Sequence, residues 1–114
     1  MPPKHNPLGL SALQLKTLTL LQELARHPET STRNEETGEI LITVIPHPHG
    51  NHVHIGRRLV MSRDATGMRN GAVWQALDRK GLARSMFPLG IALTPEGMGY
   101  DTGCRDEILL GSDH

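Results

Sequence analysis

The chain has 114 residues, the size of one ordinary domain, and is too short for two full ones. Hydrophobic residues make up 37% of it and aromatic residues only 3%. Its core must therefore be aliphatic, and it lacks the rings on which single-strand binders stack nucleic-acid bases. Twelve Lys and Arg balance twelve Asp and Glu, so no overall charge draws the chain toward nucleic acid or a membrane.

Cys104 is the single cysteine, which excludes an intrachain disulfide and a cysteine-based zinc site. Residues 1–9 contain three prolines and no apolar run, which predicts a flexible N-terminus without a secretory signal peptide. No stretch reaches the roughly 18 apolar residues of a membrane span. We therefore expect a cytoplasmic protein without a membrane partner.

The first predicted element is a helix over residues 11–26. Leucines recur at helical spacing through this segment, Ser11 is a suitable N-cap, and Pro28 stops the helix. Residues 28–38 are almost wholly polar and predict a loop.

A β-hairpin is predicted next, with Gly50 and Asn51 as its two-residue turn. Apolar and polar residues alternate on both sides of this turn, with the apolar positions at Ile40, Ile42, Val44, Val53, Ile55, Leu59 and Met61. The turn pairs residue 49 with 52, 44 with 57 and 40 with 61, which places both apolar sets on one face of the hairpin.

A second helix is expected from Thr66 or Gly67 to Lys80, with Asp64 or Thr66 as its cap and Gly81 ending it. Its buried stripe consists of Val73, Ala76 and Leu77.

The chain then continues with a short excursion over residues 84–90 and a strand over residues 91–94. Residues 101–114 are rich in acidic and other polar side chains, and they predict a polar acidic tail outside the domain.

The segments Leu77-Asp-Arg-Lys-Gly-Leu-Ala-Arg84 and Ala92-Leu-Thr-Pro-Glu-Gly97 resemble the MarR-type pattern of winged helix-turn-helix proteins. In that pattern, the recognition helix ends in a lysine-glycine-leucine turn, and the return strand of the wing runs into the next helix. The resemblance covers about residues 66–99 and implies an α+β, winged-helix-like domain over residues 10–100. The family also has a positioning helix before the recognition helix, for which residues 56–62 offer the room.

The local charge agrees with the DNA binding that this resemblance implies. Residues 57–84 hold seven Lys and Arg against two Asp, a net charge of +5, and the acidic residues lie on either side of this segment. On the expected recognition helix, Arg69, Asn70 and Gln75 lie opposite the apolar stripe and suit contacts with base edges. The expected phosphate contacts are Arg57, Arg58, Arg63, Arg79, Lys80 and Arg84. We therefore expect a winged-helix transcriptional regulator that binds double-stranded DNA as a homodimer.

Four histidines flank the predicted turn: His47, His49, His52 and His54. The register of the hairpin points all four to the same side of it. Imidazole binds zinc, nickel and copper, and no other cofactor is expected. The alternative hypothesis is therefore a non-enzymatic module on the same scaffold, which binds a metal ion at these histidines or binds another protein.

Catalytic motifs are not recognisable: the chain has no glycine-rich phosphate loop, no paired catalytic carboxylates and no Ser/His/Asp set. An enzyme is therefore not expected. One continuous basic face would favour DNA binding. Cations paired with the acidic loop residues Glu29, Glu35, Glu36 or Glu39 would favour the alternative.

Overall fold

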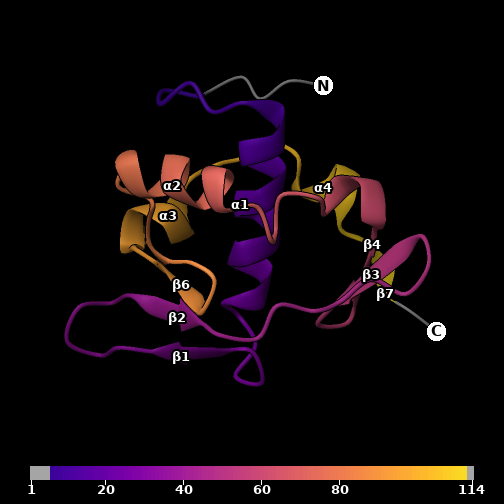
Figure 1. Ribbon diagram of the computed structural model, residues 1–114, viewed down its shortest axis with the longest axis horizontal. Coiled ribbons are helices and arrows are strands. Elements are labelled where there is room, and N and C mark those ends of the chain that lie inside the picture. The colour runs from indigo at the N-terminus through magenta and orange to yellow at the C-terminus, as the bar shows by residue number, and fades with distance from the viewer. Residues whose placement is uncertain (1–5, 113–114) are drawn as a thin grey trace.

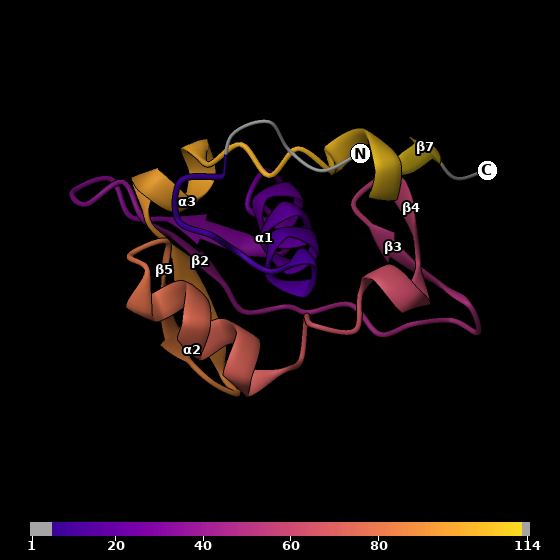
Figure 2. The same cartoon turned by 90° about the horizontal axis from the view of Figure 1, so that it is seen from above.

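The computed structural model describes residues 6–112, which form a mixed α+β domain with one central helix between two antiparallel sheets (Figure 1). The elements follow the order α1 (Ala12–Leu24), β1 (Ser31–Arg33), β2 (Ile40–Ile42), β3 (His52–Ile55), β4 (Arg58–Met61), the 3-10 helix η1 (Ser62–Asp64), α2 (Gly71–Arg79), β5 (Ala83–Met86), β6 (Gly90–Leu93), α3 (Pro95–Gly99), α4 (Arg105–Ile108) and β7 (Leu110–Ser112). The first sheet has the order β1-β2-β6-β5 and the second the order β3-β4-β7. Seen from above, α1 lies between them (Figure 2).

Helix α1 confirms the first predicted element. The Ser11 side chain accepts a hydrogen bond from the Gln14 backbone N–H, and the Gln14 side chain accepts one from the Ser11 N–H, which together form a capping box. Leu18, Leu21 and Leu24 are fully buried. The polar face of the helix is also buried at several positions, because α2, α3, α4, β3 and η1 all contact α1.

The expectation that residues 28–38 form only a loop is wrong, because Ser31–Arg33 form β1 at the edge of the first sheet. Two hydroxyl groups tie this segment to the end of α1. Thr30 donates to the Leu24 carbonyl at 2.7 Å, and Ser31 donates to the His27 carbonyl at 2.8 Å. Polar side chains here donate to carbonyl groups at the end of the helix instead of facing water. The polar composition of the segment does not indicate this.

The predicted long hairpin is correct at its turn and wrong in its partners. Residues 49 and 52 pair as expected, but β2 pairs with β1 and β6, while β3 pairs with β4. Pro46 and Pro48 lack the N–H groups that would continue the ladder. The chain reverses a second time at Gly56, between β3 and β4. Gly56 has φ +61°, and a Cβ at this position would lie 2.2 Å from His27 Nε2.

Helix α2 starts four to five residues later than predicted, because Asn70 is its cap. The Asn70 side chain accepts hydrogen bonds from the backbone N–H groups of Ala72 and Val73. Asp64 does not cap it and instead pairs with Lys16 at 2.9 Å. Gly81, with φ +76°, follows the last turn as predicted.

The segment after residue 100 packs into the fold rather than forming a tail. Ile108 and Leu109 are buried, and β7 pairs with β4 to complete the second sheet. The described residues between β2 and α2 hold a β-hairpin and the three-residue η1, so the positioning helix of the winged-helix pattern is not found there. None of the described helices is long and apolar enough to cross a membrane.

Candidate interaction surface

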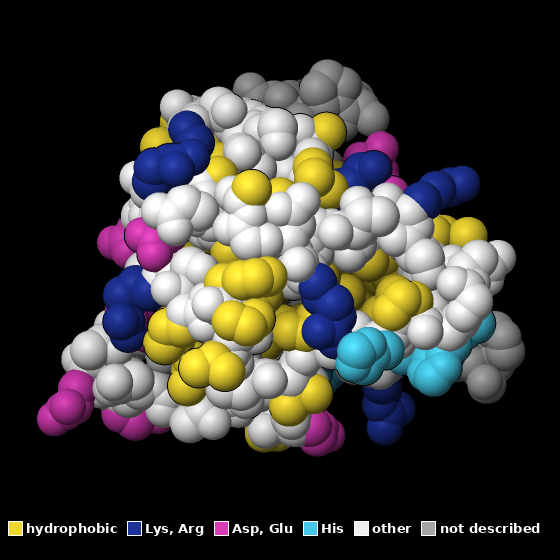
Figure 3. Space-filling view, in the orientation of Figure 1, with side chains coloured by type: hydrophobic (Ala, Val, Ile, Leu, Met, Phe, Trp, Pro, Cys, Tyr) yellow, Lys and Arg dark blue, Asp and Glu magenta, His cyan; other side chains and the backbone are white. Residues whose placement is uncertain are grey.

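The turn of the β5–β6 hairpin carries an exposed cluster of apolar side chains. Among the described residues, Leu89 is 81% exposed, Val44 49%, Phe87 47% and Met86 39%. Because Ile42 pairs with Ile91, the same register continued by two residues places Val44 opposite Leu89. We call Val44, Met86, Phe87 and Leu89 the tip patch. Met86 follows Arg84 by two residues on β5 and lies with Arg84 and Leu41 on the face of the sheet away from α2, whereas Phe87 contacts α2. Figure 3 shows hydrophobic side chains gathered on the face below α2.

Phe87 anchors the turn of the tip patch to α2. The Phe87 ring meets the buried Trp74 ring edge to face, with centroids 5.0 Å apart and an interplanar angle of 82°. Gly71 leaves the room for this contact, because a Cβ there would lie 3.2 Å from the Phe87 ring. The Leu89 N–H donates to the Met86 carbonyl at 2.8 Å and closes the turn. The turn that carries Met86, Phe87 and Leu89 is therefore tied to the domain through the Phe87 ring and closed by a backbone hydrogen bond.

The outer edge of β5 is protected against pairing with another strand. The Asp78 carboxylate accepts a hydrogen bond from the Ser85 backbone N–H at 2.9 Å, and the Ser85 hydroxyl accepts one from the Phe87 N–H at 3.3 Å. Both N–H groups are thus engaged within the domain, as in strand edges that avoid aggregation. A strand added at this edge would find the N–H groups of Ser85 and Phe87 already bonded.

Asn70 and Arg69, which were expected to contact DNA bases, make contacts within the domain instead. Both precede α2 instead of lying on it. Asn70 is occupied as the helix cap, and the Arg69 guanidinium donates to the Ile45 carbonyl and lies 3.2 Å from His47 Nε2. Of the three expected base-reading residues, Gln75 lies on the exposed face of α2 as predicted.

Three of the expected phosphate contacts have hydrogen-bond partners within the domain. Arg84 makes a bidentate pair with Glu39, with donor–acceptor distances of 2.6 to 3.0 Å, and this hydrogen bond holds the pKa of the Glu39 carboxyl below its ordinary value. Arg58 donates to the Leu109 carbonyl, and Lys80 donates to the Leu8 carbonyl, each at 2.7 Å. The remaining expected contacts, Arg57, Arg63 and Arg79, are exposed. On the face shown in Figure 3, Lys and Arg lie in separate places.

Three of the four histidines come together. The ring centroids of His52 and His54 are 5.0 Å apart, and those of His49 are 6.4 Å from His52 and 6.1 Å from His54. His47 lies instead beside Arg69. As the side chains stand, no group of three or more His, Cys, Asp or Glu among the described residues is arranged to hold a metal ion.

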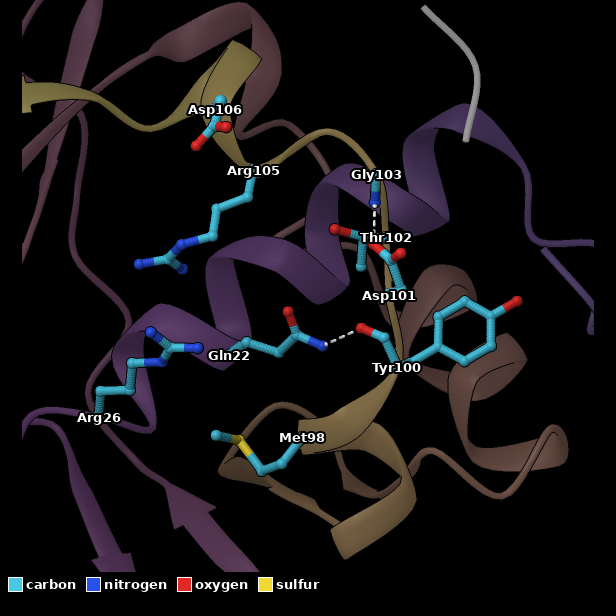
Figure 4. Close-up of a pocket in the computed structure, with 9 residues that line it drawn as sticks. All are labelled: Gln22, Arg26, Met98, Tyr100, Asp101, Thr102, Gly103, Arg105 and Asp106. Carbon is cyan, nitrogen blue, oxygen red and sulfur yellow. Dashed lines mark hydrogen bonds between the residues drawn. The ribbon is translucent and has the colours of Figure 1, made fainter. Parts of the chain in front are cut away.

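A polar pocket of about 330 Å³ lies between α1 and the segment from Met98 to Asp106 (Figure 4). The buried Gln22 amide donates to the carbonyls of Gly97 and Tyr100 at 2.8 and 2.9 Å, which ties α1 to this segment. Figure 4 shows the guanidinium groups of Arg26 and Arg105 at the same end of the pocket. Arg105 pairs with Glu23 at 2.7 Å, and its role was not anticipated from the sequence. Asp101 and Asp106 also line the pocket, so its lining carries both positive and negative charges.

Neither a family model, a curated protein nor a solved structure matches this chain.

Proposed function

We propose that this chain is a non-enzymatic interaction module that binds a second copy of itself through the tip patch. One observation carries the proposal: four large apolar side chains that lie near one turn are left in water while a structured neighbour, Trp74, holds that turn in place. Exposed apolar clusters of this kind mark contact surfaces in proteins.

A second copy is the simplest occupant because an apolar patch is complementary to itself across a two-fold axis. Near the patch, the charges of Arg84 and Glu39 compensate each other in their ion pair, so these two residues do not oppose self-contact. Four side chains supply less than the roughly 800 Å² per partner of a standard interface. The expected dimer is therefore weak and depends on protein concentration.

Sedimentation velocity over a range of protein concentrations tests this proposal. The parent protein is expected to shift from monomer toward dimer as concentration rises, and Leu89→Asp is expected to stay monomeric, because dimer formation would bury an unpaired carboxylate. Leu8→Asp is the matched control, since Leu8 is also an exposed leucine, at 38%, and lies outside the patch. A parent that is monomeric at every concentration, or equal effects of the two substitutions, would refute the proposal.

Double-stranded DNA is the second candidate partner, and the exposed polar face of α2 favours it. Gln75 and Arg79 are both exposed on this helix, which runs directly into an antiparallel hairpin, the order found in winged-helix proteins. A salt titration of binding to random duplex DNA tests it: affinity should fall steeply with salt, and Arg79→Ala should weaken binding more than Arg33→Ala on β1. No binding at low salt would exclude this candidate.

A further inference from the structure

The outer face of the β3–β4 hairpin brings three imidazoles together. His52 and His54 occupy alternate positions of β3, so they share the face opposite to that of the buried Val53 and Ile55. His49 joins them from across the turn, through its pairing with His52. The arrangement thus follows from the backbone pairing.

The spacing of the His52 and His54 rings matches what a shared metal ion requires. Ring nitrogens bind such ions at about 2 Å, which places the centroids of two ligating imidazoles roughly 5 to 6 Å apart. The His52 and His54 centroids are 5.0 Å apart and fall in this range, whereas the His49 centroid lies farther away, 6.4 Å from His52 and 6.1 Å from His54. As the side chains stand, these three rings do not converge on one point. Ligation by His49 therefore requires rotation of its exposed side chain, while His52 and His54 are half-buried.

A sulfur atom lies on the same face. Met61 is paired with His52 across the hairpin, and directly opposed residues of antiparallel strands present their side chains to one side. Thioether sulfur is a soft ligand that selects copper(I), whereas imidazole serves copper, zinc and nickel alike. The same register places the apolar Leu59 opposite His54.

We propose that this face binds a copper ion, with His52 and His54 as its principal ligands and His49 and Met61 completing the set. His47 is outside the site because its Nε2 atom faces the Arg69 guanidinium at 3.2 Å. The site is separate from the tip patch, and it stands or falls independently of self-association.

Titration of the full chain with copper(I), kept reduced, and separately with Zn²⁺ tests the site, with imidazole NMR signals as the readout. Both ions are diamagnetic, so the signals of His49, His52 and His54 are expected to shift while those of His47 and His27 stay in place. Copper(I) affinity is expected to fall about tenfold or more in His54→Ala, and Met61→Leu is expected to weaken copper(I) but not Zn²⁺.

His47→Ala is the matched control and is expected to leave both affinities unchanged. Far-UV circular dichroism of each variant separates loss of the site from loss of the fold. No shift of the three imidazole signals with copper(I), or equal losses in His47→Ala and His54→Ala, would overturn the proposal. An unchanged copper(I) affinity in Met61→Leu would overturn the assignment of copper.

Discussion

Two arginine–glutamate pairs in this molecule have similar chemistry and different surroundings. Arg105 and Glu23 are 2.7 Å apart, with side chains 34% and 8% exposed, and join α4 to the central helix. Arg84 and Glu39 are 2.6 Å apart, with side chains 60% and 17% exposed, and lie on β5 and just before β2. The second pair has several hydrogen bonds, yet the first joins segments that are farther apart in the sequence. Burial, rather than the number of contacts, is expected to decide what each pair contributes.

The buried pair is part of a small network. His27 Nε2 lies 3.2 Å from the second oxygen of the Glu23 carboxylate, one turn along the same segment. Burial acts to raise the pKa of the Glu23 carboxyl, but the hydrogen bonds from Arg105 and His27, together with the positive charges of Arg105 and Arg26, lower that pKa below its ordinary value. Glu23 is therefore stabilised as an anion in the folded state.

The largest effect is expected from Glu23→Ala. It leaves the partly buried Arg105 guanidinium without its anion and should lower the free energy of unfolding by about 2 to 3 kcal/mol, a value below that of a fully buried pair because Arg105 is partly exposed. Urea denaturation at neutral pH measures it. A loss no larger than that of Arg84→Ala would contradict the comparison.

The pH dependence of stability separates the charge of Glu23 from its shape. Because the folded pKa lies below the unfolded one, this carboxylate stabilises the fold above the unfolded pKa of about 4.3, and the contribution disappears as pH falls through the folded pKa. The stability difference between the parent and Glu23→Gln is thus expected to be constant above pH 5 and to shrink at lower pH. Denaturation curves of both proteins from pH 7 to pH 3 measure this. A difference that does not change with pH would show that Glu23 acts only by packing.

Asn70→Ala is expected to have an intermediate effect, because it removes a neutral cap at an exposed position. Loss of the two hydrogen bonds to the start of α2 should cost about 1 kcal/mol, and Asn70→Asp should restore most of it. The same denaturation experiment measures both variants. Equal stability of Asn70→Ala and the parent would mean that water replaces the cap without cost.

The smallest effect is expected from Arg84→Ala. Its pair with Glu39 is exposed to solvent and salt, so the midpoint of urea unfolding should not change measurably. A loss equal to that of Asn70→Ala would show that this bidentate pair, despite its exposure, holds the first sheet together.

Local signals in the sequence predicted some elements well. The leucine spacing and Ser11 predicted α1, and Gly81 predicted the end of α2. The start of α2 was also within reach, because Asn70 is as good a cap residue as the two that were chosen. Long-range choices were not within reach: alternation predicts a strand at β2 but not whether it pairs with residues 59–61 of β4, as expected, or with β6. The short β1 and β7 are strands only because a neighbour pairs with them.

In the candidate sites, too, the sequence predicted the local contacts and not the long-range ones. The turn at residues 50 and 51 predicted the proximity of His49 and His52, whereas the separation of His47 depends on Arg69, which is remote in the sequence. The tip patch had one local signal, the apolar sequence Met-Phe-Pro-Leu from Met86 to Leu89 at a turn, where polar residues are usual. The sequence did not indicate that the Phe87 ring packs on Trp74 and so fixes the position of this turn.

The place of β7 at the edge of the second sheet has a consequence for synthesis on the ribosome. Its strand partner β4 ends some fifty residues earlier in the chain, so the β3–β4 hairpin leaves the exit tunnel long before its third strand does. During that interval the backbone N–H and C=O groups along the β4 edge have no ladder partner, and such an edge invites pairing with other chains. The domain thus passes through an aggregation-sensitive stage that lasts until its final strand has emerged.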